Sequence, residues 1–228
     1  MRFVITNDDG YGAPGLATLA ELVQPIGRVT VVAPHAPQSG IGHQVTMKTP
    51  IQVIRGSEKD HFVVHGAPAD CTRLAVKSLV PDVDWVLAGI NPGANLGSDA
   101  YQSGTIAAAR EAAILGVKAV AVSQYIGPDR VLDWQATGEQ VAIILPMLLK
   151  ERLAPGQFWN INLPSTLVAG CRVDYQFGPL DKHPHKYQFR KEGDNYHYEG
   201  IIHDRPRTAG SDVDICFGGK ISITRMEI

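Results

Sequence analysis

The hydrophobic pattern of this chain alternates between short, continuous apolar runs and longer stretches in which apolar residues recur every three or four positions. The continuous runs are rich in β-branched residues and predict buried strands, whereas the periodic stretches predict amphipathic helices. The predicted strands are residues 2–6, 28–33, 82–88, 117–123 and 158–163. The predicted helices are residues 16–23, 66–79, 104–115 and 134–150.

This alternation of strands and helices predicts the fold class. Parallel strands need long crossover connections, and helices of this length supply them. We therefore expect an α/β fold: a doubly wound, mostly parallel sheet with helices on both faces, in a Rossmann-like three-layer arrangement. Residues 44–55 and 61–64 alternate loosely and predict short edge strands.

The helical period stops after residue 164, and short polar and apolar segments follow. We therefore divide the chain into an α/β core, residues 1–164, and a β-rich extension, residues 165–228, packed beside the sheet. The extension contains several aromatic residues, namely Tyr187, Phe189, Tyr196, Tyr198 and Phe217. Aromatic surface beyond a complete sheet is typical of an interface, so we expect the extension to mediate self-association.

Composition narrows the class of protein further. With 228 residues, of which 44% are hydrophobic, the chain can bury one sizeable core. The formal charge of −2 provides no basic field for polymeric nucleic acid, and no apolar run approaches the ~18 residues of a membrane span. The three cysteines are scattered without a C-x-x-C motif, which argues against a disulfide framework or zinc site and favours a reducing, cytoplasmic setting.

The first predicted strand ends in two adjacent carboxylates, Asp8 and Asp9. They fall at the carboxyl end of the strand, where open parallel sheets place their ligands. Two neighbouring carboxylates repel each other unless a cation or water shields them. Asn, Asp and Gly are also common turn residues, so a solvated turn is the alternative interpretation.

Two later loops add oxygen donors at the same predicted edge. Ser39 follows the strand 28–33, and Asn91 and Asn95 follow the strand 82–88. None of these loops offers a thiolate. Together with the two carboxylates, such hard oxygen donors suit Mg²⁺ or Mn²⁺ better than zinc or copper.

The start of the predicted helix 104–115 is a candidate phosphate site. Ser103, Gly104 and Thr105 place hydroxyl groups and unpaired backbone N–H groups at the positive end of this helix. A cation and a helix N-terminus that face one crevice describe a site for a phosphate ester. Each loop alone is weak support, and their concurrence is what favours this chemistry.

These segments together resemble the SurE survival-protein family of metal-dependent 5'/3'-nucleotidases. The matching motifs cover about the first half of the chain, in the family's order, and their combination is highly specific. They are N-D-D-G at 7–10, A-P-G at 13–15, V-V-A-P at 31–34, S-G at 39–40, D-C at 70–71, G-I-N-P-G-A-N-L-G at 89–97 and S-G-T at 103–105.

The resemblance implies a set of site residues. One divalent cation per subunit, Mg²⁺ or Mn²⁺, would be held by Asp8, Asp9, Ser39 and Asn91. Phosphate would bind at Asn95, Ser103, Gly104 and Thr105. The implied reaction is hydrolysis of a nucleoside monophosphate to nucleoside and phosphate, with Asp8 or Asp9 orienting an attacking water and no phosphoenzyme.

Two other functions remain open. A haloacid-dehalogenase-like phosphatase would need a nucleophilic Asp in a D-x-D arrangement, whereas Asp8 and Asp9 are adjacent. A non-catalytic nucleotide-binding module would bind the same ligand without turnover. The G-x-G-x-x-G fingerprint of dinucleotide-binding domains is missing from the first loop.

The chain departs from the family pattern at two places. Ala67 stands where the family usually has Thr, which removes one polar group near the site. The chain stops at Ile228, whereas family members generally continue into a further helix that joins subunits. We therefore expect a homodimer held by strands of the extension, with a tetramer as the alternative assembly.

Overall fold

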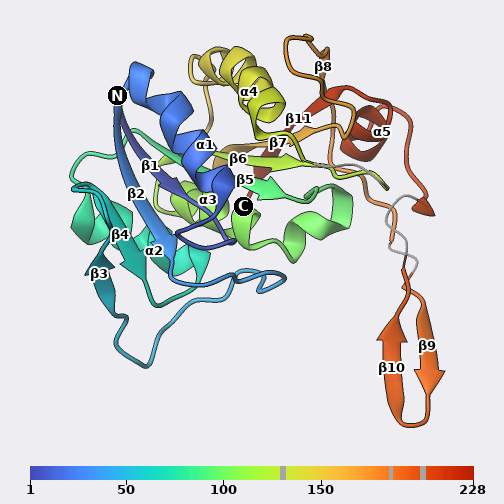
Figure 1. Cartoon of the computed structure of the whole chain (residues 1–228), viewed down its shortest axis with the longest axis horizontal. Helices are drawn as coiled ribbons and strands as arrows, with labels where there is room; N and C mark the ends of the chain where they lie inside the picture. Colours follow the sequence, from blue (N-terminus) through green and yellow to red (C-terminus); the bar gives the residue numbers. More distant parts are fainter. Residues whose placement is uncertain (129–131, 185–186, 201–203) are drawn as a thin grey trace.

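The computed structural model describes residues 1–128, 132–184, 187–200 and 204–228 (Figure 1). Within these residues the central feature is a nine-stranded sheet with the order β3-β4-β2-β1-β5-β6-β7-β11-β8. Its strands are β1 (Arg2–Thr6), β2 (Arg28–Pro34), β3 (Val53–Arg55), β4 (His61–Val64), β5 (Trp85–Pro92), β6 (Lys118–Gln124), β7 (Gln157–Leu163), β8 (Tyr175–Phe177) and β11 (Ile221–Glu227). All pairings from β4 across to β7 are parallel, which confirms the predicted fold class.

Helices cover both faces of this sheet (Figure 1). On one face α1 (Pro14–Val23) packs beside α4 (Trp134–Leu148), and on the other α2 (Pro68–Leu74) packs beside α3 (Gly104–Ile114). This part also contains two 3₁₀ helices, η1 (Gln24–Ile26) and η3 (Gly97–Tyr101), and one π-helix, η2 (Ala75–Leu79). No helix in the described part of the chain is long and apolar enough to cross a membrane.

The alternation of side chains along each strand divides the core into two layers. In β1, Phe3 and Ile5 pack in the cluster that includes α1 and α4, whereas Val4 packs with α2 and α3. All three side chains are fully buried. Because successive side chains point to opposite faces, a strand covered on both faces requires a continuous apolar run.

Two strands of the segment after β7 join the sheet instead of packing beside it, which differs from our expectation. β11 pairs antiparallel with β7, and β8 pairs parallel with β11 at the edge. A short helix, α5 (Asp212–Phe217), precedes β11. The sequence pattern did not predict this helix because six residues are too few to establish a helical period.

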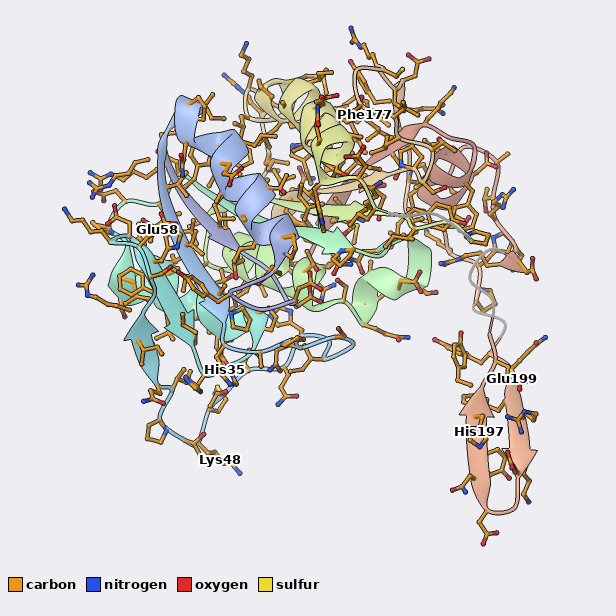
Figure 2. The ribbon with its side chains drawn as sticks, viewed as in Figure 1. His35, Lys48, Glu58, Phe177, His197 and Glu199 are labelled. Atoms are coloured by element: carbon orange, nitrogen blue, oxygen red, sulfur yellow. The ribbon has the colours of Figure 1, made fainter. Side chains whose placement is uncertain are left out.

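The strands β9 (Phe189–Glu192) and β10 (Asn195–Tyr198) form a separate antiparallel hairpin, which we call the arm. The arm projects away from the body, and the labelled side chains of His197 and Glu199 lie on it or at its end (Figure 2). Every residue of both strands is exposed. An isolated two-stranded hairpin is only marginally stable in water, so the arm has no core of its own to hold it.

Candidate active site

The order of the strands brings the predicted metal ligands to one edge of the sheet. Asp8 and Asp9 directly follow β1, which lies between β2 and β5. Ser39 lies in the loop after β2, and Asn91 is near the end of β5. The first two loops are in contact, because the backbone N–H of Gln38 donates to the Asp8 carbonyl oxygen at 2.7 Å.

Asp8 is buried against the start of α3. The Thr105 hydroxyl donates a hydrogen bond of 2.5 Å to Asp8 Oδ1. A Cβ atom on Gly104 would lie only 2.8 Å from Asp8 Cβ, so the close approach of the two segments requires glycine there. Burial raises the pKa of Asp8, while hydrogen bonds from the Thr105 side chain and from the backbone of Thr105 and Gly104 oppose that rise.

Asp9 lacks the donors that Asp8 has. Burial, followed by the charge of Asp8, raises the pKa of Asp9 to about 7. Its Oδ2 atom is buried without a hydrogen-bond partner. A buried carboxylate oxygen without a donor is costly, and a bound cation would remove that cost. The pair Asp8 and Asp9 therefore fits a cation rather than a solvated turn.

Asn91 and Ser39 offer neutral oxygen atoms at the same edge. The Asn91 Nδ2 atom donates to the Gly93 carbonyl at 2.7 Å, which leaves the side-chain oxygen for another partner. Ser39 is exposed in its loop. Groups of three or more His, Cys, Asp or Glu side chains that could hold a metal are absent from the described residues. A cation at this edge would therefore combine two carboxylates with neutral oxygen atoms, as Mg²⁺ and Mn²⁺ accept.

Two of the predicted phosphate-binding residues already have partners within the protein. Ser103 caps α3, since its Oγ atom accepts from the Ile106 N–H at 3.1 Å. The Asn95 side chain donates from Nδ2 to Ser123 Oγ at 2.7 Å. Gly104 and Thr105 lie directly against Asp8, so the start of α3 and the acidic loop form one continuous surface.

The loop that contains Asn95 is held by two asparagines of β7 that the sequence analysis did not single out. The Asn95 carbonyl accepts from Asn160 Nδ2 at 2.9 Å and from Asn162 Nδ2 at 3.1 Å. The Asn95 N–H donates to Asn162 Oδ1 at 2.7 Å. Both β7 side chains are fully buried. Two polar residues inside the apolar run F-W-N-I-N-L are the signal that could have indicated them.

A buried ion-pair cluster fastens the Ser39 loop to α3. Glu111 of α3 is buried and accepts from Arg73 Nε at 2.5 Å, and its other oxygen lies 2.8 Å from His43 Nε2. Arg73 is therefore paired with a buried carboxylate. Glu111 is 68 residues away from His43 in the chain, so the spacing of the sequence does not indicate this contact.

The loop after His43 is also tied to the start of α2. The Asp70 carboxylate accepts from the backbone N–H and the hydroxyl of Thr46, at 2.9 and 2.8 Å. It also accepts from the Ala67 N–H at 3.0 Å, so the backbone of Ala67 is capped although its side chain is apolar. Asp70 therefore has a structural role on this side of the site.

Comparison with known proteins gives an independent description of the chain. The family model of the survival protein SurE matches residues 3–179. A Synechocystis protein named provisionally as a 5'-nucleotidase is 43% identical over 228 residues, covering 100% of both chains. The 5'-nucleotidase SurE of Brucella canis is 34% identical over 239 residues, covering 100% of this chain and 92% of its own. The crystal structure of the SurE protein from Aquifex aeolicus superposes with a TM-score of 0.87 and 29% identity, covering 100% of this chain and 93% of the other.

Proposed function

The chain belongs to the survival protein SurE family and is a 5'-nucleotidase, and we propose that it is a divalent-metal-dependent phosphomonoesterase that converts nucleoside monophosphates to nucleoside and phosphate. The observation that carries the metal dependence is the pair Asp8 and Asp9. Asp8 is buried and Asp9 is half-buried, the pKa values of both are raised, and one oxygen of Asp9 has no partner. Such a pair is stable as two anions only beside a cation.

The residues that would hold the cation are Asp8, Asp9, Ser39 and Asn91. Asp8 and Asp9 supply the charge, and the Asn91 side-chain oxygen is left available by the hydrogen bond that its nitrogen makes to Gly93. A bound Mg²⁺ or Mn²⁺ supplies Lewis-acid charge for the phosphoryl group and for the activation of water. We assign one such ion to each subunit.

The protein's own groups then position the substrate and the attacking water. The N-terminus of α3, at Ser103, Gly104 and Thr105, provides a positive end of a helix dipole for the phosphate. Asn95, in the loop that follows β5, is the remaining residue of the proposed phosphate site. Asp9, whose Oδ2 atom has no partner within the protein, can accept a hydrogen bond from water and orient it for in-line attack.

The mechanism contains no covalent phosphoenzyme. A haloacid-dehalogenase-like reaction uses a nucleophilic Asp in a D-x-D arrangement, whereas Asp8 and Asp9 are adjacent, and Asp8 Oδ1 already accepts a hydrogen bond from the Thr105 hydroxyl at 2.5 Å. Rapid quenching with ³²P-labelled AMP, followed by mass analysis of the acidic peptide, tests this point. A phosphorylated Asp8 or Asp9 would replace our mechanism with the aspartyl-phosphate one.

The central experiment is a metal-dependence assay on the purified protein. We expect AMP hydrolysis in Mn²⁺ or Mg²⁺ and none after treatment with EDTA, with recovery when the metal is returned. Equal rates with metal and with chelator would contradict the proposal. Binding of AMP without turnover under any metal would instead support a non-catalytic nucleotide-binding module.

We further propose that the protein is a homodimer joined through its arm. Phe189 and Tyr198 are directly paired across the two strands and are 59% and 54% exposed, which is unusual for aromatic side chains of a stable hairpin. A second copy of the chain would bury these rings and stabilise the hairpin. Light scattering should give a dimer mass at micromolar concentration, and Phe189→Ser with Tyr198→Ser should give a monomer. A wild-type monomer with full activity would contradict this assembly.

A further inference from the structure

A cavity of about 440 Å³ opens beside Asp9 on the face of the sheet covered by α1 and α4. Residues 9–15 of the first loop form one side of its lining. Sites for small ligands usually have volumes of about 300–1,000 Å³, so this cavity can accept a group larger than phosphate. The cavity lies next to a predicted metal ligand. It can therefore hold the rest of a substrate whose phosphate group is bound at the acidic loop.

Besides Tyr11 of the first loop, whose hydroxyl group is hydrogen-bonded to Ser57 and His61, rings from two distant parts of the chain line this cavity. Trp134, the first residue of α4, contributes one of them and is half-buried. Its indole lies close to Gly15, where a Cβ atom would be 2.8 Å from Trp134 Cη2. Because Gly15 has no side chain, the Trp134 indole can lie in this position in the cavity wall.

His35, at the end of β2, contributes the second ring. It stacks on His65, with ring centroids 4.2 Å apart and an interplanar angle of 19°. Figure 2 shows His35 on the same side of the body as the long loop after β2. The stack limits the rotation of His35 and keeps a flat, exposed ring in the lining of the cavity.

The charges around the cavity restrict what it can bind. Asp9 is the only acidic residue in its lining, and neither Lys nor Arg contributes to it among the described residues. Pro37 and Pro92 make the remaining walls largely apolar. Such a lining suits a flat, uncharged ring system and does not suit a second phosphate group.

We propose that this cavity is the nucleoside subsite and that Trp134 and His35 bind the nucleobase by stacking. The proposal rests on the nucleotidase function, because the base of a substrate is expected beside the acidic loop only if the phosphate of a nucleotide binds there. Stacking on aromatic side chains accepts every base, since each base has a π-face. The subsite therefore selects nucleoside monophosphates over phosphate esters without a base, with little preference among bases.

The first test compares two substrates that differ only by the base. AMP contains the nucleobase, whereas ribose 5-phosphate retains the sugar and phosphate. In Trp134→Leu and in His35→Ala we expect kcat/KM for AMP to fall ~10-fold, mainly through KM, as expected for the loss of a base stack. kcat/KM for ribose 5-phosphate should stay within twofold of the wild-type value.

Matched variants separate binding from folding. Trp134→Phe retains a ring and should restore most of the AMP activity. Because His35 is exposed, His35→Ala tests the cavity without removing core packing. An equal loss on both substrates, or no loss on either, would overturn the proposal.

A second measurement does not depend on turnover. Trp85 and Trp159 are 2% and 1% exposed, so Trp134 is the tryptophan that a ligand can reach. Adenosine, which has no phosphate, should quench the fluorescence saturably, and Trp134→Phe should abolish that quenching. Quenching that persists in Trp134→Phe would place adenosine elsewhere. If neither ester is hydrolysed while adenosine still quenches Trp134, the nucleotidase function fails and the nucleoside site stands.

Discussion

Two pairs of aspartates, largely withdrawn from water, differ in how their charges are satisfied. Asp8 and Asp9 follow β1, whereas Asp181 and Asp212 lie where the C-terminal segment meets the loop after β5. Asp8 is held by one hydroxyl and the start of α3, and one oxygen of Asp9 has no partner. In the second pair, both carboxylates accept hydrogen bonds from donors elsewhere in the protein.

Asp181 is surrounded by donors. The Ser211 hydroxyl and the Thr208 N–H each donate to Oδ2 at 2.7 Å, and the His183 N–H donates to Oδ1 at 2.7 Å. Burial alone would raise the pKa of Asp181, but these hydrogen bonds outweigh it and lower the pKa to about 2. The charge of this carboxylate is therefore satisfied within the chain.

Asp212 connects the same region to the site. Its oxygens accept from the backbone N–H groups of Asp181 and Gly97, each at 2.8 Å, and from Val213 at 2.9 Å. Burial still raises its pKa, because backbone donors only partly offset the loss of water. Gly97 begins η3, which leads into α3, so this aspartate ties the C-terminal segment to the phosphate side of the site.

The contrast distinguishes structural carboxylates from functional ones. Burial occurs in both pairs, so burial alone does not identify a ligand site. A carboxylate whose acceptors are filled by protein donors stabilises the fold, whereas one with an empty acceptor is available for a cation.

The largest effect is expected from Asp8→Asn and Asp9→Asn. Each removes a charge from the proposed cation site, and we expect the turnover of AMP to fall at least ~10²–10³-fold, comparable to the loss of a direct electrostatic contact in other enzymes. Steady-state assays at saturating Mn²⁺ measure this, with circular dichroism to confirm folding. Near-normal turnover by Asp8→Asn at low metal would make this carboxylate a turn residue only.

A smaller effect is expected from the neutral oxygen donors. Ser39→Ala and Asn91→Ala should weaken metal affinity ~10–100-fold, with partial activity at saturating metal, because the two carboxylates remain. Titration of activity with Mn²⁺ gives the apparent Kd of the metal. Ser78 is exposed in η2, so Ser78→Ala is the matched control. An unchanged Kd in both variants would remove these residues from the site.

Asp181→Asn should affect stability and leave catalysis nearly unchanged. The folded pKa is about 2 and the ordinary value is 3.8, so the charge contributes stability that is present above pH 4 and lost as the pH falls towards 2. From this shift we expect a loss of ~2 kcal/mol in the free energy of unfolding at pH 7. Urea unfolding at pH 7 and pH 3 measures it, with the exposed Asp174→Asn as control. A loss of equal size at both pH values would contradict the charge-based explanation.

Asp9→Asn should increase the free energy of unfolding of the metal-free protein, whereas Asp181→Asn should decrease it. The folded pKa of Asp9 is about 7 and its ordinary value is 3.8, so the folded chain keeps a proton that the unfolded chain loses between these pH values. Stability in EDTA should therefore fall as the pH rises from 4 to 7. Because Asp9 is partly exposed, we expect Asn to recover only ~1–2 kcal/mol at pH 8.

Urea unfolding in EDTA at pH 5 and pH 8 measures this difference. Asp194→Asn, in the exposed turn of the arm, is the control. Addition of Mn²⁺ should stabilise the wild type more than Asp9→Asn, because metal binds the folded state. A less stable Asp9→Asn in EDTA would mean that Asp9 is already satisfied without a cation.

Much of the fold was predictable because its signals are local. The apolar runs of β1 and β2 and the periodic stretches of α1 and α4 each lie within one segment, and burial on both faces imposes a continuous run. The acidic pair was also predictable, because Asp8 and Asp9 are adjacent and follow a strand. The roles of β8, β11 and α5 were not, because short elements carry little periodicity.

The sequence by itself therefore determined the α/β class, the edge of the sheet where chemistry is expected and the candidates Asp8 and Asp9. Only the tertiary structure decided which polar groups meet there. Glu111 reaches His43 across 68 positions, and Asn162 reaches Asn95 across 67. Hydrophobic periodicity reports the surroundings of one segment, whereas these pairings depend on strand order and helix placement, which no single segment specifies.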